Sequence, residues 1–518
     1  MAYKTNLSVL NGKKPLELVL RLNSFSGGEN TIGEDQALKN NESRNIENWQ
    51  VESLGGMERA TGFTQVAAKV SVTSDALDLV VQHKESTSTK VYGIVDGDLV
   101  SGTGLAVEDV GAFTSGKLCS AVSAGDKLWI TNATDNLKYK TIAGAITIPS
   151  DVPTVASPRI YEHKFRLIAE GSGKVVYGSK AGTGNWVDAD AWSLANDAWN
   201  ITIPDITTGG VPNFPSGQEF SVFTEFGVYS ISNFPNVTYR PIANAHGCEN
   251  AYSIANGNEG VFFVSKYPTL GIYLWDRVNF INLTEFNDFV DKIDFTARMY
   301  GEYRNNKYYF FYVETGTGAT EPNRLRIYNT KFGRWSQRPV NSELDDNLGY
   351  PALLKYSNNE LYSGSSNKTI IYELESGTSD AGVDTIATLK TKDFSSRDFE
   401  LANGAGVFPI DEVRMKLTKM TITFFGISDV ITVQWQADRG LHSGNQTVEI
   451  DAAGDKLNTT FTVNTSKVVQ LPPDTTRTVS FNNSAVGRRF NFQINTTGSG
   501  TLPRIKNIKI HALAIEED

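Results

Sequence analysis

The chain is poor in cysteine, which excludes a fold held together by a disulfide framework. Cys119 and Cys248 are the only cysteines among 518 residues, they lie far apart in the sequence, and neither belongs to a Cys-x-x-Cys pair. We therefore expect two reduced, largely buried thiols in a protein made in a reducing compartment.

Long apolar runs are also missing. No stretch of about 18 apolar residues occurs, so the sequence predicts no membrane-spanning helix. The first twenty residues carry Lys4, Lys13 and Lys14 but neither an apolar centre nor a small-residue cleavage site, and we expect no signal peptide. These features predict a soluble protein made in the cytoplasm, which would leave the cell by lysis or as part of a particle.

Charged residues are few, and acidic ones slightly outnumber basic ones. Only 20% of residues are charged, and 48 basic against 58 acidic side chains give a net charge of −10. A protein that coats duplex DNA needs a cationic surface to displace counterions from the phosphates, so that class is disfavoured. A protein past which DNA slides without being held remains compatible with this balance.

Histidine is too scattered for a metal site. No two histidines stand at i, i+2 or i, i+4, and we expect each of the five in a surface or turn position: His83, His163, His246, His442 and His511. His246 and Cys248 would share one face of a strand, but no third group follows to orient them as a nucleophile pair.

Other catalytic patterns are absent or incomplete. The pairs Asp96/Asp98 and Asp188/Asp190 resemble pieces of calcium loops, but neither continues with the further acidic ligands, so we interpret them as solvated turn carboxylates. No Gly-rich phosphate loop and no nucleophile elbow occurs. The sequence thus predicts no catalytic, cofactor-binding or metal-binding residues and no enzyme.

Aromatic residues and glycine, in contrast, are abundant. The chain contains 27 Phe, 20 Tyr, 8 Trp and 45 Gly, a composition typical of an all-β protein with frequent turns. Helix is expected only as one or two turns near residues 34–40 and 285–293.

Short strand-turn-strand units recur along residues 66–376. They span residues 77–99, 118–139, 160–177, 220–231, 261–281, 299–335 and 352–372, at intervals of roughly 40 to 60 residues, the blade period of a β-propeller. Turns such as Asn305-Asn306 tolerate the positive φ of two-residue hairpins. We predict a propeller of about six blades, with five or seven allowed by the irregular spacing, and a long insertion at residues 181–215.

A Gly- and Ser-containing stretch at residues 377–382 marks a linker to a second β domain. Six alternating segments between residues 418 and 515 predict a C-terminal β-sandwich over residues 384–518. Residues 1–65 are expected to form an extended N-terminal arm and docking segment. Within it, residues 24–63 combine a Gly-Gly opening, Asn48-Trp49, and a Gly-Gly-x-x-Arg-x-x-Gly close.

The order of these features resembles the packaged-DNA-stabilisation, or tail hub and nozzle, proteins of short-tailed bacteriophages. Four further segments carry the resemblance: SVFTEFGVYSISN at 221–233, the Gly-Cys-containing run at 246–276, RLRIYNTKFGRWS at 324–336, and the closing strand and hairpin at 487–510. The resemblance implies a virion protein without cofactor that forms a homohexameric ring below the portal and adaptor. Such a ring helps to retain the packaged genome and forms part of the ejection conduit, through which DNA passes without specific binding.

The rival hypothesis is a propeller on a virion surface that binds or degrades glycans. Hydrolysis would need paired carboxylates, for which Glu225 and Asp276 are candidates because they lie near strand ends. Aromatic side chains at Trp186, Trp192 and Trp199 could stack on sugars, although we favour a contact with a neighbouring subunit. A basic stripe, formed by Arg488, Arg489, Lys506 and Lys509, could contact phosphate, but we favour solvated side chains.

Overall fold

The computed structural model describes the following residues: 16–31, 38–51, 56–68, 77–149, 152–153, 158–171, 173–182, 192–193, 197–242, 245–285, 287–339, 348–354, 360–365, 368–377, 379–380, 386–402, 413–425, 429–438, 441–450, 475–481, 485–497 and 504–515. The chain forms two compact units. Unit 1 comprises Met1–Gly62, Arg334–Arg338 and Gly377–Asp518, and unit 2 comprises Phe63–Gly333 and Pro339–Ser376. Among the described residues, no helix is long and apolar enough to cross a membrane.

Unit 2 is a β-propeller, as the sequence predicts. Its antiparallel sheets follow one another along the chain. They are β7–β10 (Leu77–Glu85, Ser88–Val95, Asp98–Ser101, Ala106–Asp109), β11–β13 (Cys119–Ala124, Lys127–Asn132, Lys138–Lys140), β14–β17 (Arg159–His163, Arg166–Glu170, Val175–Gly178, Trp199–Thr202), β18–β21 (Thr207–Pro212, Phe220–Thr224, Val228–Ser232, Thr238–Pro241), β22–β25 (Ala255–Asn256, Val261–Ser265, Gly271–Trp275, Phe280–Asn282), β26–β28 (Tyr300–Arg304, Lys307–Tyr312, Arg324–Asn329), and β30–β32 (Leu348–Leu354, Glu360–Ser365, Ile370–Leu374) joined by β6 (Phe63–Ala68).

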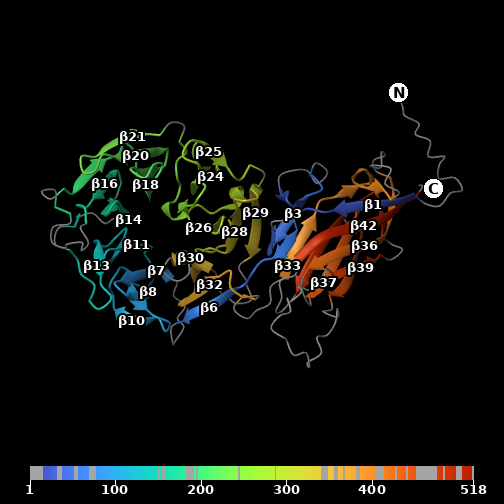
Figure 1. Ribbon diagram of the computed structural model, residues 1–518, viewed down its shortest axis with the longest axis horizontal. Coiled ribbons are helices and arrows are strands. Elements are labelled where there is room, and N and C mark those ends of the chain that lie inside the picture. The colour runs from blue at the N-terminus through green and yellow to red at the C-terminus, as the bar shows by residue number, and fades with distance from the viewer. Residues whose placement is uncertain are drawn as a thin grey trace, which may run out of the picture. The chain divides into compact units, whose positions relative to one another are not determined.

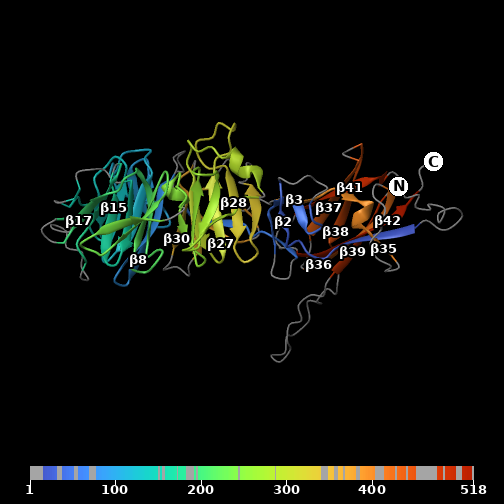
Figure 2. The same ribbon diagram turned by 90° about the horizontal axis from the view of Figure 1, so that it is seen from above.

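The first strand of each sheet lines the inside of a ring. β7 contacts β11, β11 contacts β14, β14 contacts β18, and β18 contacts η3 (Ala251–Ser253), the 3-10 turn just before β22. β22 contacts β26, β26 contacts β30, and β30 contacts β7, which closes the circle. Figure 1 shows these strands nearer the centre than β13, β16, β21 and β25, and Figure 2 shows the strands of unit 2 running alongside one another. Six of these sheets contain only strands of unit 2, and β26–β28 form a seventh group of paired strands in the described residues. Each of the seven strand-turn-strand units expected from the sequence therefore lies in a different sheet.

The ring is closed by a strand from the beginning of the unit. β6 pairs antiparallel with β32, with Phe63 opposite Leu374 and Ala67 opposite Ile371. The last sheet therefore takes its outermost strand from residues that precede the first sheet by sequence. This arrangement places the start of the propeller at residue 63, close to the expected residue 66.

Turn chemistry follows the prediction at the hairpin between β26 and β27. Asn305 and Asn306 have φ of 50° and 61°, the left-handed conformation that a two-residue hairpin of this type requires. The β27 strand that follows has Tyr308, Tyr309, Phe310, Phe311 and Tyr312 all buried, since both of its faces pack against neighbouring strands.

The insertion and the short helices expected from the sequence differ in part from those in the structure. The insertion at residues 181–215 is shorter than expected, because β17 completes the third sheet and β18 begins the fourth. The short helix expected at 285–293 is the 3-10 helix η4 (Asp288–Lys292), and a second 3-10 turn, η3 (Ala251–Ser253), precedes β22. Most of the helix expected at 34–40 lies outside the described residues.

Unit 1 is a β-sandwich. One sheet has the strand order β35-β1-β42-β36-β39, with β4, β5 and β40 attached: β1 (Leu16–Leu22), β4 (Trp49–Val51), β5 (Met57–Arg59), β35 (Glu400–Leu401), β36 (Met415–Phe425), β39 (Thr475–Ser480), β40 (Val486–Gly487) and β42 (Arg504–Ala514). The other sheet has the order β29-β3-β33-β41-β37-β38, with β2 and β34 attached: β2 (Gly28–Glu29), β3 (Glu42–Glu47), β29 (Arg334–Pro339, in unit 1 up to Arg338), β33 (Ile386–Thr391), β34 (Phe394–Ser395), β37 (Asp429–Ala437), β38 (His442–Ile450) and β41 (Arg489–Thr497), with the 3-10 turn η6 (Ser396–Asp398) following β34.

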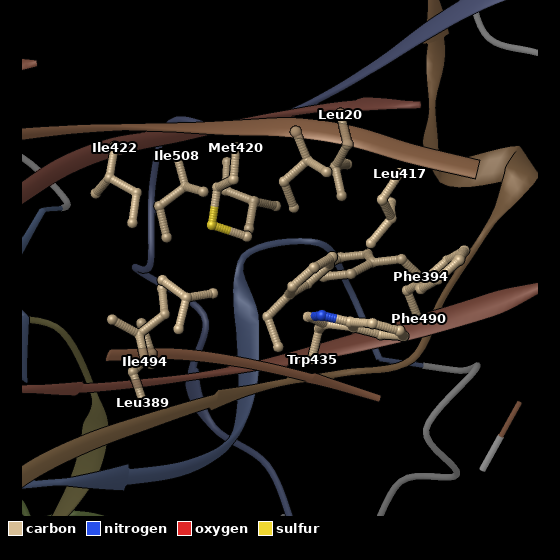
Figure 3. Close-up of a cluster of buried hydrophobic side chains, with 14 of the residues drawn as sticks. Leu20, Leu389, Phe394, Leu417, Met420, Ile422, Trp435, Phe490, Ile494 and Ile508 are labelled. Carbon is tan, nitrogen blue, oxygen red and sulfur yellow. The ribbon is translucent and has the colours of Figure 1, made fainter. Parts of the chain in front are cut away.

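The core of unit 1 lies between the two sheets. Leu20, Leu417, Met420, Ile422 and Ile508 from the first sheet point toward Leu389, Trp435, Phe490 and Ile494 from the second (Figure 3). Each of these side chains is almost completely buried, as expected for strands in which apolar and polar residues alternate.

The described part of the N-terminal segment, from Leu16 to Gly62, belongs to unit 1 and is not a separate arm, which corrects that part of the expectation for residues 1–65. Its strand β1 lies between β35 and β42 and supplies the buried Leu18, Leu20 and Leu22. The physical reason is its alternating sequence LELVLRL, which buries one face only when the strand is part of a sheet.

The Asn- and Gly-rich motif of this segment serves the sandwich. Asn48 has φ of 55° and turns the chain from β3 in one sheet to β4 in the other, and its Nδ2 donates to the carbonyl of Ile386 at 2.8 Å. Trp49 is fully buried in the core. At Gly62 a Cβ atom would lie 1.9 Å from the carbonyl oxygen of Ser379, so no larger residue fits without a backbone shift.

Candidate functional site

The inner strands of unit 2 carry a partly buried cluster of charged and aromatic side chains where they begin. The mouth cluster, as we name it, consists of Asp78, Arg159, Tyr252, Arg298 and Glu321. Asp78 and Arg159 are among the first two residues of β7 and β14, Tyr252 lies in η3 before β22, and Arg298 precedes β26. Glu321 lies in the loop between β27 and β28. Because the first strands of a propeller run in the same direction, their beginnings gather at one mouth of the central channel.

Arg298 connects three inner strands. Its Nη1 lies 2.9 Å from Oδ1 of Asp78 and 3.0 Å from Oε1 of Glu321, and its Nη2 donates to the carbonyl of Gly116 at 3.3 Å. Asp78 is the second residue of β7, Gly116 precedes β11, and Arg298 precedes β26. The guanidinium thus links strands from three different sheets, which is possible only because the ring is closed.

The second arginine of the cluster stacks on an aromatic ring. The guanidinium carbon of Arg159 lies 3.2 Å from the centroid of the Tyr252 ring, a cation–π contact between β14 and η3. The charge of Arg159 also acts on Glu170, a fully buried carboxyl on β15. The hydroxyl of Tyr161 lies 3.4 Å from Oε1 of Glu170 and accepts a hydrogen bond from the amide of Gly210 at 2.8 Å.

Burial makes the carboxyl groups here weak acids. Loss of hydration raises the pKa of Glu170 to about 8 and outweighs the opposing effects of Arg159 and the Tyr161 hydrogen bond. Burial likewise raises the pKa of Glu321 to about 7, although Arg298 lowers it, and raises the pKa of Asp78. Near neutral pH, Glu170 is therefore largely protonated.

Polar contacts between inner strands continue along the channel. His83 on β7 and Ser123 on β11 share a hydrogen bond of 2.8 Å, and Nδ1 of His163 on β14 accepts from the amide of Asn213 at 3.2 Å. Both rings are fully buried, and burial lowers the pKa of His83 and brings that of His163 to about 4. The expectation of surface or turn positions was wrong for these two histidines, because inner strands of a propeller are covered on both faces.

His246 and Cys248 each have a local role. The ring of His246 stacks on Tyr273 with centroids 4.0 Å apart, and burial lowers its pKa. Sγ of Cys248 donates to the carbonyl of Asn250 at 3.3 Å, and burial raises the pKa of this thiol to about 12, as it does for Cys119. A thiol this far from ionising is a poor nucleophile. Both cysteines are buried and neither is part of a disulfide, as predicted.

The other two histidines and the two aspartate pairs considered as pieces of calcium loops are not among the residues of the mouth cluster. His511 on β42 lies 3.1 Å from Oε1 of Glu17 on β1, and the side chain of His442 lies outside the described residues. Asp98 accepts from the amide of Gly111 at 2.7 Å and Asp96 accepts from the hydroxyl of Ser115, so both hold a loop in place. Asp188 and Asp190 lie outside the described residues. No group of three or more potential metal ligands occurs in the part of the chain that the structure describes.

Glu225 and Asp276 are not brought together. Glu225 is exposed in the hairpin where the second strand of its sheet, β19, ends. Asp276 follows the third strand of the next sheet, β24, and accepts hydrogen bonds from the amides of Val278 and Asn279. Second and third strands of a propeller sheet end on opposite sides, so these carboxylates do not form the pair that glycoside hydrolysis needs.

The tryptophans of the 181–215 segment pack into the propeller itself, which corrects the expectation of a subunit contact. Trp192 lies in a core cluster with Trp129 and Leu167, and Trp199 lies in another with Phe220 and Ile231. Both are at most 7% exposed, so neither offers a ring for stacking. Trp186 lies outside the described residues.

The structure does not bring the four residues of the possible basic stripe together on one sheet. Arg488 and Arg489 lie at the start of β41, whereas Lys506 and Lys509 lie on β42, and these strands belong to opposite sheets of the sandwich. The four side chains therefore cannot line one strand face.

Sequence reasoning missed the mouth cluster. Its members are scattered over more than 240 positions, and only ring closure brings them together. The available signal was a charged residue inside an otherwise apolar strand, as in Leu77-Asp78-Leu79.

Comparisons with known proteins give little beyond this geometry. No family model and no curated protein matches the chain. Among solved structures, the computationally designed protein Ika8 is 9% identical over 60% of this chain and 99% of its own, with a TM-score of 0.37. The extracellular domain of the putative hybrid two-component system BT3049 from B. thetaiotaomicron is 11% identical over 80% of this chain and 57% of its own, with a TM-score of 0.42.

Proposed function

We propose that the chain is a structural subunit of a bacteriophage tail, in the hub or nozzle ring below the portal and adaptor. It would reside in the virion, help to retain the packaged genome and form part of the ejection conduit. The observation that supports this proposal is the combination of a closed propeller with a β-sandwich and the ordered motifs of the sequence. Motif 221–233 forms the β19–β20 hairpin, motif 324–336 includes β28, and motif 487–510 includes β41.

The conduit of such a ring would lie between subunits. In a single propeller the channel mouth is occupied by Arg298, which contacts Asp78 and Glu321 across strands from different sheets. A DNA duplex does not fit through strands that approach each other this closely. DNA would therefore pass through the centre of the oligomer, where the net charge of −10 per chain disfavours adhesion to phosphates.

The mechanism is mechanical rather than chemical. Cyclic symmetry builds a ring from identical subunits when the same surface patches meet at every interface. A propeller suits this use because its sheets pack against both neighbours and its first strand, β6, pairs with its last strand, β32. The subunit would hold its shape under pressure from packaged DNA.

Electron microscopy of the purified chain tests the proposal. Negatively stained particles should show rings with a central opening, six subunits around. A uniform population of single propellers at micromolar concentration would count against a ring-forming tail protein.

The glycan-degrading alternative is less well supported. The described carboxylates near the channel, Asp78 and Glu321, are bound to Arg298, and Glu225 and Asp276 lie on opposite sides of the sheets. A depolymerisation assay on bacterial surface polysaccharide separates the two hypotheses, because a structural tail subunit releases no reducing ends.

A further inference from the structure

The outer face of the second sandwich sheet is covered by amide side chains. Outward positions on β3, β37 and β41 alternate with buried ones and are partly or fully exposed. We name as the amide face the six residues Asn45, Gln434, Gln436, Asn491, Gln493 and Asn495.

Strand pairing brings these residues into rows. Gln493 lies opposite Gln434 on one side and Lys390 of β33 on the other, and Asn491 lies opposite Gln436. Asn45 lies opposite Lys390, which connects β3 to the same row. Neighbouring outward side chains across strands are about 5 Å apart, so the rows form a continuous polar surface.

The outer face of the other sandwich sheet has a different composition from the amide face. Its outer face carries charged side chains, with an ion pair between Arg21 and Glu400 and a contact of 3.1 Å between His511 and Glu17. Such charge pairs keep a solvated sheet face soluble at little energetic cost. Asparagine, in contrast, is depleted in strands, and three asparagines at outward strand positions need an explanation other than solvation.

A hollow of about 390 Å³ adjoins the rows. Asn45 and Asn491 line it together with Arg44, Lys390 and Asp393. Asp393 Oδ1 accepts from Asn491 Nδ2 at 2.7 Å, and Nη1 of Arg44 donates to the carbonyl of Thr31 at 2.7 Å. Two cations against one carboxylate give the hollow an excess positive charge within an acidic chain.

We propose that the hollow and the amide face bind an acidic polysaccharide. An amide side chain offers two donors and an acceptor, which match sugar hydroxyls that both donate and accept. Lys390 and Arg44 are placed to hold a carboxylate of the same polymer. The rows extend along the sheet from the hollow, so successive sugars of one chain meet successive amides.

Single-stranded nucleic acid fits this surface less well. Binding of this kind relies on aromatic rings that stack on bases, and the six residues of the amide face include none. Two cations are also few for a phosphate backbone, whose affinity comes mainly from charge. The carboxylated, hydroxyl-rich polymer is therefore the occupant that this surface favours.

Isothermal titration of the full chain with an alginate oligosaccharide, a polyuronate, tests the proposal. We expect saturable binding, and about tenfold weaker binding for Gln434→Ala/Gln493→Ala, because two hydrogen-bonding side chains are lost. The control Thr421→Ala/Lys509→Ala alters an equivalent cross-strand pair on the outer face of the other sheet and should bind like the unchanged protein. Unchanged thermal unfolding shows that each variant is folded.

A second variant separates charge from hydrogen bonding. Lys390→Gln keeps a polar side chain and should remove the preference for alginate over neutral dextran. The proposal is overturned by absence of alginate binding, by equal binding of all variants, by equal affinity of the unchanged protein for dextran, or by a preference for an oligothymidylate. None of these outcomes bears on ring formation, so this test is independent of the tail function.

Discussion

At the scale of single residues, burial in the propeller changes the pKa of ionisable side chains. Glu170 is the clearest case, because it is fully buried and its pKa is raised to about 8. A carboxyl whose pKa is higher in the folded than in the unfolded protein stabilises the fold below its unfolded pKa. That contribution is lost as the pH rises through the folded pKa.

Glu170→Gln should therefore make unfolding less dependent on pH. Glutamine keeps an acceptor for Tyr161 but cannot ionise, so the variant gains up to about 4 kcal/mol relative to the unchanged protein between pH 5 and pH 9. Urea unfolding at several pH values measures the difference. The matched change Glu225→Gln, at an exposed turn, should leave the pH profile as it is. If the free energy of unfolding of Glu170→Gln changed with pH just as it does for the unchanged protein, the Glu170 carboxyl would not be protonated in the folded protein.

Arg298 should be the most costly residue of the mouth cluster to remove. Arg298→Ala leaves Asp78 and Glu321 without their partner in a buried setting, and we expect a loss of about 3–5 kcal/mol in the free energy of unfolding. The control is Arg240→Ala, which breaks an ion pair with Glu219 in which the arginine is 60% exposed, and should cost less than about 1 kcal/mol. Similar losses for both variants would contradict a special role for Arg298.

At the scale of elements, strand periodicity located most of the fold. The six segments expected in the sandwich correspond to β36, β37, β38, β39, β41 and β42, and each of the seven propeller units falls in a separate sheet. Alternation and turn residues are local signals, so they can be found in one sequence.

Long-range pairing could not be found in this way. β1 lies between β35 and β42, and β6 pairs with β32 across about 300 residues. The first strand of the fourth sheet, β18, was also missed, because its sequence TTGGVP is interpreted as a loop. Its glycines are needed where the side chain of Phe220 packs against Gly210. The amide face could not be predicted from the sequence for a related reason, because its residues align only through the pairing register of three strands.

The closing strand β6 gives a prediction at this scale. Phe63 is 2% exposed and its ring meets Tyr372 of β32 edge-on, with centroids 5.0 Å apart. Phe63→Ala should lower the free energy of unfolding by about 3–5 kcal/mol. Phe226→Ala, at a half-exposed position in another sheet, should change it by less than about 1 kcal/mol. Chemical denaturation compares the two, and a cost below about 1 kcal/mol for Phe63→Ala would show that β6 does not hold the ring closed.

At the scale of the whole molecule, the two units divide the proposed work. The propeller supplies a stiff subunit whose channel mouth is occupied by its own side chains, and the sandwich supplies a polar face suited to an acidic polysaccharide. Among the described residues of both units, no group of three or more potential metal ligands occurs.

Sedimentation of the purified full chain at micromolar concentration tests the central claim most directly. The account predicts a discrete assembly of about six times the 56.8 kDa chain mass, in keeping with a closed ring. A single species at the mass of one chain, unchanged as the concentration is raised, would contradict it.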